Sequence, residues 1–249
     1  MPIISSGAAI GGAEIVKNNL IHYFDFSNEN CYVGGVSLTI NDLSGRNYGG
    51  TATNFAGTTS SGFNPGIRFV TFDGSNDYIN IGNISAYNFA YNDSYSVCVW
   101  FKLTADDNSM LISKAKATYP YNGWYLHYSS GGEDLLFSLV NNTSYRWRID
   151  SNATLSTDTW YYVVATHTYS SPNHVGTLYV NTVEGHNTVY NTLTTQGTTS
   201  TENVNLGARS DDNNMADASI AITQIYNRVL TASEVKYNYY CDAARFGLS

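Results

Sequence analysis

The sequence contains few charged residues, and basic residues are the scarcer sign. Only 13% of the 249 residues are charged, with 12 Lys and Arg against 20 Asp and Glu, which gives a formal net charge of −8. The basic residues form no cluster, so the sequence lacks the positive surface that displaces counterions from nucleic-acid phosphates. We therefore expect no nucleic-acid partner, and we interpret the acidic balance as a contribution to solubility.

Cysteine is also scarce, and its spacing excludes several kinds of site. The three cysteines, Cys31, Cys98 and Cys241, are far apart and odd in number, whereas a disulfide-stapled secreted domain usually has an even set. No CxxC pair is present to predict a zinc site. Cys98 lies in an apolar run and is expected to be a small buried side chain. Whether Cys31 pairs with Cys241 depends on whether the two ends of the fold meet, and the sequence leaves this open.

Long apolar runs are absent as well. No segment approaches the length that spans a bilayer, so membrane insertion is not expected. The first residues lack the basic start and continuous apolar core of a secretion signal. Their Ser, Gly and Ala content favours an extended arm, which either frays or lies along a partner. We expect residues 1–19 to form this arm as an attachment segment, and residues 20–249 to form one domain.

Tyrosine and glycine are abundant, with 21 of each, as is typical of a protein built from strands and turns. Hydrophobic residues alternate with period two almost everywhere, for example over residues 95–103. Residues 160–166 are bulky on both faces, which predicts a central strand covered on both sides. Turn-rich segments separate the expected strands. The pattern predicts an all-β fold, a two-sheet antiparallel jelly-roll sandwich in a single domain.

One short helix is predicted near the end of the chain, over Ala232–Tyr240. Thr231 is placed to cap it, and Glu234, three residues further on, completes a capping box. Leu230 and Val235 have the spacing of a hydrophobic staple. A single capped helix after many strands is expected to pack on a sheet as a closing element.

Several short motifs occur in a fixed order along two hundred residues. They are LIHYFDFSN with Asp25, then Asn41–Asn47, Phe72–Ile79, Tyr95–Lys102, Trp160–Thr166, Leu178–Thr182, Asn205–Gly207 and Ile225–Glu234. This order resembles the laminin-G-like domains of the concanavalin A-like lectin/glucanase superfamily, as found in structural proteins of tailed phages. The resemblance implies a jelly-roll fold. Ala221 and Ile222 replace an Asp-Glu pair that many members carry, so any role of that pair is lost, and Tyr162 replaces a histidine.

The acidic residues lack the catalytic pattern of glycosidases in this superfamily. Those enzymes place carboxylates on one strand face, often as E-x-D-x-x-E, because the acid and the nucleophile flank one bond. Glu133 and Asp134 lie instead in an expected turn, where neighbouring side chains point apart. Metal-ligand spacings are also missing among the histidines, which are His22, His127, His167, His174 and His186. We therefore predict that the protein is not an enzyme, with no catalytic residues.

Two oxygen-rich loops are candidates for calcium, and no other cofactor is expected. In the first, Asp73, Asn76 and Asp77 are expected to bond the backbone of their own turn. The second, Asp211–Asp217, is either a metal or ligand loop or a solvated hairpin. Neither loop has the ligand spacing of an EF-hand.

Aromatic residues mark a possible recognition surface. The segment Tyr119–Tyr125 contains three tyrosines and a tryptophan, and Pro120 stiffens it. Such clusters bind sugars or proteins, because each ring offers an apolar face and a polar tip. Tyr237, Tyr239 and Tyr240 are expected to pack the helix on the sheet.

These observations favour a non-enzymatic structural or decoration protein of a phage virion, on the capsid surface or in a fibre. Its loops would touch host-surface glycans, and the arm at residues 1–19 would bind other virion proteins or a second copy. The alternative is an extracellular bacterial carbohydrate-binding or adhesion module. A signal peptide encoded upstream of Met1 would favour the alternative.

Overall fold

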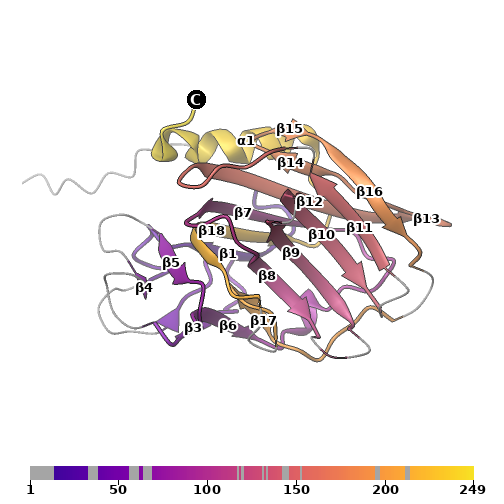
Figure 1. Ribbon diagram of the computed structural model, residues 1–249, viewed down its shortest axis with the longest axis horizontal. Coiled ribbons are helices and arrows are strands. Elements are labelled where there is room, and N and C mark those ends of the chain that lie inside the picture. The colour runs from indigo at the N-terminus through magenta and orange to yellow at the C-terminus, as the bar shows by residue number, and fades with distance from the viewer. Residues whose placement is uncertain are drawn as a thin grey trace, which may run out of the picture.

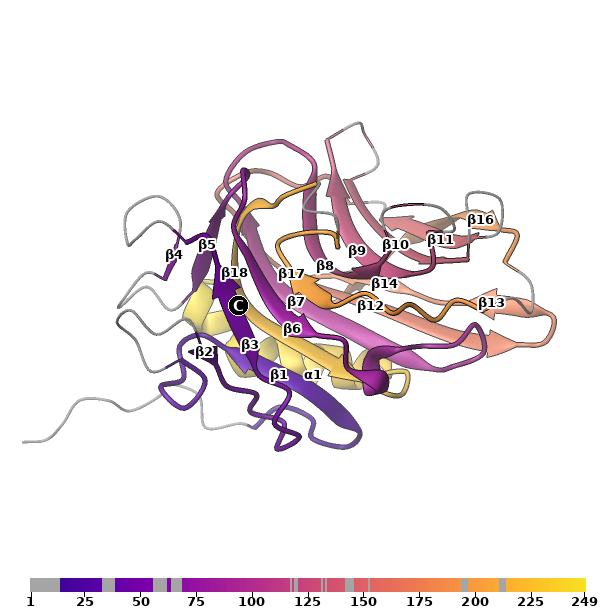
Figure 2. The ribbon, with the colours of Figure 1, turned by 90° about the horizontal axis from the view of Figure 1, so that it is seen from below.

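Strands occupy most of the described chain, as the period-two pattern predicts. The computed structural model describes residues 14–32, 39–55, 62–63, 69–116, 118, 121–130, 132, 134–141, 146–151, 153–193, 197–210 and 214–249. Within these residues the strands form two antiparallel sheets of nine strands each, followed by one α-helix. The two sheets face each other, and the helix lies outside one of them (Figures 1 and 2). The predicted two-sheet jelly-roll sandwich with a short C-terminal helix is confirmed.

The first sheet carries the helix. Its strands are β1 (Leu20–Asp25), β4 (Gly62–Phe63), β5 (Val70–Asp73), β7 (Tyr95–Leu103), β12 (Trp160–Ser170), β13 (Asn173–Val175), β14 (Leu178–Val180), β15 (Val183–Glu184) and β18 (Asp217–Tyr226). Their order is β15-β14-β12-β7-β18-β5-β4, with β1 paired to β18 and β13 paired to β12.

The second sheet lies on the other side of the core. Its strands are β2 (Thr39–Ile40), β3 (Gly50–Thr53), β6 (Tyr78–Gly82), β8 (Ser109–Ala115), β9 (Gly123–Ser129), β10 (Asp134–Val140), β11 (Arg146–Ser151), β16 (His186–Asn191) and β17 (Val204–Leu206). Their order is β16-β11-β10-β9-β8-β17-β6-β3-β2. The face of this sheet that points away from the core is therefore a candidate for a binding surface.

Alternation along β12 divides the buried residues into two apolar clusters. Val163 and Ala165 point into the inter-sheet core, between the two sheets. Tyr162 and Val164 point the other way, into an outer cluster beneath the helix. The outer cluster consists of Ile15, Leu20, Cys98, Trp100, Tyr162, Val164, Tyr179, Ala221, Ile222, Tyr226, Leu230, Val235, Tyr239 and Ala243. Because β12 pairs with β7 and β14, the prediction of a central strand covered on both sides is confirmed.

The helix α1 (Ala232–Asp242) begins at the predicted capping box. Thr231 Oγ1 accepts a hydrogen bond from the Glu234 amide at 3.3 Å, and a Glu234 carboxylate oxygen accepts one from the Thr231 amide at 2.9 Å. Arg228 donates to both Glu234 oxygens, and this hydrogen bonding lowers the pKa of Glu234 to about 2. Leu230 and Val235 are both buried in the outer cluster, as expected of a hydrophobic staple.

Replacing Thr231 with alanine tests this helix start. The Thr231→Ala variant leaves the Glu234 amide without its capping oxygen, so we expect the free energy of unfolding to fall by about 1 kcal/mol. Urea denaturation at pH 7 measures the change. Thr201→Ala, at an exposed position outside the helix, is the matched control and should unfold like the parent chain. Equal midpoints for both variants would contradict the role of the cap.

The helix tyrosines follow the prediction only in part. Tyr239 is buried and stacks on Trp100, with ring centroids 5.4 Å apart. Tyr237 and Tyr240 are 47% and 53% exposed, so the expectation that they pack the sheet is wrong. The reason is helical spacing: residues three apart share a face, and these two lie on the face turned away from the buried Val235 and Tyr239.

The three cysteines are free thiols. Cys31 is buried and Cys241 is half-buried, and the structure forms no disulfide between them. Burial raises the pKa of the Cys31 thiol to about 12, which keeps it protonated and unreactive. Cys98 is a buried member of the outer cluster, as predicted.

Residues 14–19 lie against the helix and β18. Ile15 is buried in the outer cluster, the Val16 amide donates to Asn238 Oδ1 at 2.8 Å, and the Tyr226 hydroxyl donates to the Val16 carbonyl at 2.9 Å. Residues 1–13 of the expected arm lie outside the described residues. A truncation that tests the arm alone should therefore stop at residue 13. No helix in the described ranges is both long and apolar enough to cross a membrane.

Candidate functional site

One polar row crosses the outer face of the second sheet. Residues paired directly across antiparallel strands point to the same face. The row is Thr51, Asn80, Asn205, Ser113, Tyr125, Ser138, Arg148 and Tyr190. Strand neighbours of these residues, such as Ile79, Leu206 and Leu126, belong to the inter-sheet core. The polar row therefore faces away from the core, and three of its members, Ser113, Ser138 and Asn205, are buried there.

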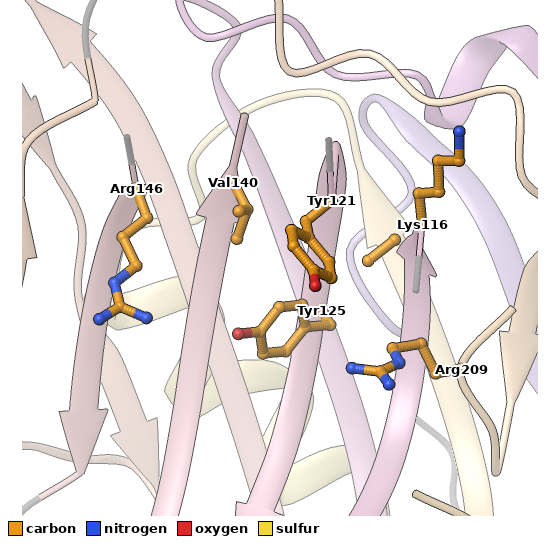
Figure 3. A pocket seen from close by; sticks show the side chains of 7 residues that line it. Lys116, Tyr121, Tyr125, Val140, Arg146 and Arg209 are labelled. Carbon is orange, nitrogen blue, oxygen red and sulfur yellow. The ribbon is translucent and has the colours of Figure 1, made fainter. Parts of the chain in front are cut away.

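A pocket of about 170 Å³ opens at one end of strands β8 to β11, beside this row. It is lined by Ala115, Lys116, Tyr121, Tyr125, Val140, Arg146 and Arg209 (Figure 3). Ala115 and Val140 both pair with Gly123, and the short side chains of the first two and the missing one of the third leave space for the pocket. Gly123 has a φ of 132°, and a Cβ there would lie 2.0 Å from the Lys114 carbonyl, so only glycine fits.

Two tyrosines of the predicted aromatic segment line the pocket. Figure 3 shows the rings of Tyr121 and Tyr125 lying between Arg146 on one side and Arg209 on the other. Tyr121 has a left-handed backbone with a φ of 51°, an uncommon conformation for a bulky residue that is often found at binding sites. Aromatic faces of this kind stack on the apolar side of flat or ring-shaped ligands.

Trp124, which belongs to the same segment, does not line the pocket. Trp124 points into the inter-sheet core, where its indole Nε1 donates to the Tyr87 carbonyl at 2.8 Å. Tyr119 and Pro120 lie outside the described residues. The recognition surface predicted from this segment therefore reduces, in the described structure, to Tyr121 and Tyr125.

The pocket combines its aromatic rings with three basic side chains. Arg146 stacks on Tyr190, with its guanidinium carbon 3.4 Å from the ring centroid. In the described part of the chain no carboxylate pairs with Arg146 or Lys116. Arg148, two residues along the same strand, is instead paired with Asp150 through two hydrogen bonds of 2.7 and 3.1 Å. Stacking holds Arg146 in place while leaving its charge uncompensated.

The basic residues of this pocket were not predicted from the sequence. Lys116, Arg146 and Arg209 are far apart along the chain, and only strand register brings them together. A partial signal was present, because the alternation of residues 146–150 places Arg146 and Arg148 on the face opposite Trp147.

The oxygen-rich loops show no metal site among the described residues, where no group of three or more His, Cys, Asp or Glu could hold an ion. Asp73 Oδ1 accepts hydrogen bonds from the amides of Ser75 and Asn76, at 2.9 and 3.3 Å, so it holds its own turn as expected. Residues 211–213 of the second loop lie outside the described residues, and Asp217 begins β18. Calcium binding at that loop stays a prediction.

The described residues that line the pocket include no Asp or Glu. Glu133 and the side chain of Asp134 lie outside the described residues. Asp25, from the first family motif, accepts hydrogen bonds from Ser27 and from Arg245 and thereby ties β1 to the C-terminal segment.

The fold of the chain is shared with known proteins. Residues 73–236, more than half of the chain, match the model of a family described as the concanavalin A-like lectin/glucanases superfamily. The chain belongs to this superfamily. The matched region runs from β5 into α1 and includes every residue that lines the pocket. No curated protein sequence matches this lectin-like chain.

Solved structures show the same lectin-like fold at low sequence identity. The binding domain of Paraclostridial Mosquitocidal Protein 1 is 17% identical, with a TM-score of 0.61, over 90% of this chain and 53% of that one. The binding domain of botulinum neurotoxin DC, in complex with SialylT, is 16% identical with a TM-score of 0.59, over 90% and 51%. Trypanosoma rangeli sialidase in complex with sialic acid is 13% identical with a TM-score of 0.59, over 100% and 36%. The chain thus spans about half or less of these proteins.

Proposed function

We propose that this lectin-like domain binds acidic glycans in the pocket beside Tyr121 and Tyr125. The observation that carries the proposal is Arg146, a stacked guanidinium without a carboxylate partner in the described residues, next to two aromatic rings. Small-molecule sites typically combine apolar and aromatic walls with a few placed polar groups, as this pocket does.

The chemistry of the pocket fits a sugar that carries a carboxylate or a sulfate. Tyr125 offers a ring on which the apolar face of a pyranose can stack. The guanidinium group of Arg146, held by its stacking on Tyr190, presents N–H donors that suit a carboxylate or sulfate oxygen pair. Arg209 adds positive charge on the other side of the rings. Lys116 points away from the rings in Figure 3, so it adds positive potential at the rim rather than a contact over the tyrosines.

The structural neighbours are consistent with a sugar ligand. One is a toxin binding domain in complex with SialylT, and another is a sialidase in complex with sialic acid. At these identities the likeness establishes only the fold, so the ligand class rests on the pocket of this chain. The sialidase also makes catalysis worth testing.

We further propose that the domain binds glycans without cleaving them. Glycosidases of this superfamily use paired carboxylates, and the pocket has none among its lining residues. Prolonged incubation with acidic and neutral polysaccharides should release no reducing ends and no free sialic acid. Measurable release that depends on the folded protein would overturn this part of the proposal.

We propose the kind of assembly that carries this domain from its sequence motifs. Their order resembles structural proteins of tailed phages, which favours a virion component, on the capsid or in a fibre, over the alternative of an extracellular bacterial adhesion module. The 1–19 arm would then be the attachment segment to virion proteins or to a second copy. Mass spectrometry and electron microscopy of purified particles decide this: a stoichiometric chain supports the virion, and its absence favours the alternative.

Substitution of Arg146 tests the binding site. Arg146→Gln removes the charge and the paired donors, so affinity for acidic sugars should fall by about tenfold to a hundredfold. Calorimetry with sialic acid, glucuronic acid and galactose 6-sulfate separates carboxylate from sulfate as the preferred anion. Arg46→Gln makes the same charge change in the exposed loop between β2 and β3 and should bind like the parent chain. If none of the three acids binds the parent chain, the proposal fails.

A further inference from the structure

We infer that the glycan site continues into a second subsite, lined by side-chain amides, which holds a neutral sugar. The domain would then bind an oligosaccharide of at least two sugars, with the acidic sugar at the tyrosine pocket. The order of the two sugars rests on the proposed function. The second subsite itself is argued from its own residues.

The second subsite is a pocket of about 150 Å³ over β6 and β17. Its lining is polar throughout and consists of Tyr78, Asn80, Glu202, Asn203, Asn205 and Ser210. It adjoins the tyrosine pocket, because Arg209 lines the first pocket and Ser210 lines the second. The Ser210 hydroxyl also donates to the carbonyl of Ala115, a residue of the first pocket, at 2.8 Å.

Strand register places the two pockets along one line. Tyr125 pairs with Ser113 on β8, Ser113 pairs with Asn205 on β17, and Asn205 pairs with Asn80 on β6. Neighbouring strands are about 4.8 Å apart, so three steps cover about 14 Å from Tyr125 to Asn80. A linear glycan lying across the strands would contact both pockets.

A buried acceptor in the second pocket lacks a partner. Asn205 is 4% exposed, and no residue in the described ranges donates a hydrogen bond to its Oδ1. A buried acceptor without a donor is unfavourable, so such groups are rare unless a ligand or water completes them. Asn80 Oδ1 accepts a hydrogen bond from the Gly82 amide at 2.8 Å, which leaves the Asn80 amide nitrogen available to donate. An acceptor beside a donor suits a hydroxyl group, which both donates and accepts.

The charge of the pocket favours a sugar over a metal ion. Its volume of about 150 Å³ gives room for several water molecules, which a bound sugar would displace. Glu202 is the one carboxylate among the six lining residues, whereas calcium sites usually collect several.

One wall of the pocket is held in place from below. The buried Lys114 donates through Nζ to Asn83 Oδ1, at 2.7 Å, and to the carbonyl of Glu202. This anchors the segment that carries Glu202 and Asn203 against the end of β8. A pocket with fixed walls loses less entropy when it binds a ligand.

Binding of free sialic acid and of sialyllactose tests the linked subsites. Sialyllactose should bind the parent chain about tenfold more tightly than sialic acid does, because its neutral part reaches the second pocket. Asn205→Ala should remove that gain and leave the affinity for sialic acid unchanged, whereas Arg146→Gln should weaken both. Equal weakening of both ligands by Asn205→Ala would overturn the inference.

A second measurement tests the subsite without an acidic sugar. Methyl glycosides of glucose, galactose, mannose and N-acetylglucosamine are titrated while the side-chain amide signals of Asn80 and Asn205 are followed by NMR. At least one glycoside should shift these signals, both in the parent chain and in Arg146→Gln. If none does, the inference fails whatever the acidic sugars do. If a glycoside binds but no acidic sugar does, only the proposed function fails.

Thermal unfolding separates a binding role of Asn205 from a structural one. Because its Oδ1 has no donor in the described residues, Asn205→Ala should keep or raise the midpoint while removing the glycoside response. A lowered midpoint would assign Asn205 a structural role and contradict the inference.

Discussion

Replacing Trp100 with alanine is expected to lower the free energy of unfolding by about 3–5 kcal/mol. Trp100 is 1% exposed and lies at the centre of the outer cluster. Its ring stacks on Tyr162, Tyr239 and Phe246, with centroid distances of 5.1, 5.4 and 4.3 Å. These contacts join the first sheet to α1 and to the segment after it, so their loss should leave a cavity that the helix cannot refill.

Urea unfolding of Trp100→Ala, followed by near-ultraviolet circular dichroism, measures this effect. Tyr240→Ala is the control, because it also removes an aromatic ring next to the cluster but from a side chain that is 53% exposed. It should change the free energy by less than about 1 kcal/mol. Similar losses in the two variants would show that the outer cluster does not hold the helix on the sheet.

Acidification from pH 7 to pH 4 is the second large expected effect, with a net loss of about 4 kcal/mol in the free energy of unfolding. Burial lowers the pKa of His22 to about 4 and the pKa of His167 to about 3, from an ordinary value of 6.5. Both folded-state pKa values lie below that of the unfolded chain. The unfolded chain therefore takes up protons first, and stability falls as the pH decreases from about 6.5 towards 4.

Burial, rather than their polar contacts, keeps these histidines neutral. His22 Nε2 lies 2.9 Å from Thr223 Oγ1, in the buried interior. His167 lies between the Asp93 carbonyl, at 2.9 Å from Nδ1, and His174 Nδ1, at 3.0 Å from Nε2. A second histidine beside the first adds repulsion if both become charged, and the pKa of His174 is also lowered, chiefly by burial.

One carboxyl group acts in the opposite direction. Burial raises the pKa of Asp242 to about 6 from 3.8, so the folded chain gains its proton before the unfolded chain does. By pH 4, His22 and His167 each remove about 3 kcal/mol from the free energy of unfolding, and Asp242 restores about 2 kcal/mol.

Denaturation at pH 7, 6, 5 and 4 measures the net slope. His167→Gln should show a shallower decline than the parent chain, since one titrating group is gone. Thr201→Ala, at an exposed position, should reproduce the slope of the parent chain. A flat profile in the parent chain would show that the buried histidines do not control acid stability.

Features that depend on residues close together in the sequence were mostly predicted correctly, whereas features that depend on distant residues were not. Alternation is a local property, so both faces of β7 and β12 were predicted correctly from their own residues. The capping box was equally local, because Thr231 and Glu234 are one helical turn apart. The tyrosines of the helix were assigned by composition rather than by position, and the two exposed ones were therefore misplaced.

The site itself depends on register, which the alternation pattern leaves undetermined. A shift of two residues of β11 against β10 would keep Arg146 on the same face but move it by about 7 Å along the strands, away from the other pocket residues. Gly123 could be recognised as a turn signal, but its role in leaving space for a ligand follows only from its pairing with Ala115 and Val140. Tyr121 and Tyr125 were found in advance because they belong to one aromatic segment.

The position of α1 has a practical consequence for how the domain can be mounted. Residues 14–19 and the C-terminal residues both lie on the helix side of the first sheet (Figure 1). The residues that line the two pockets lie on the outer face of the second sheet. A biotin or fusion partner joined after Ser249 would therefore leave the binding face pointing outward. Copies mounted side by side on a bead or sensor chip would engage a glycan-coated surface together, so weak single-site binding would become measurable through avidity.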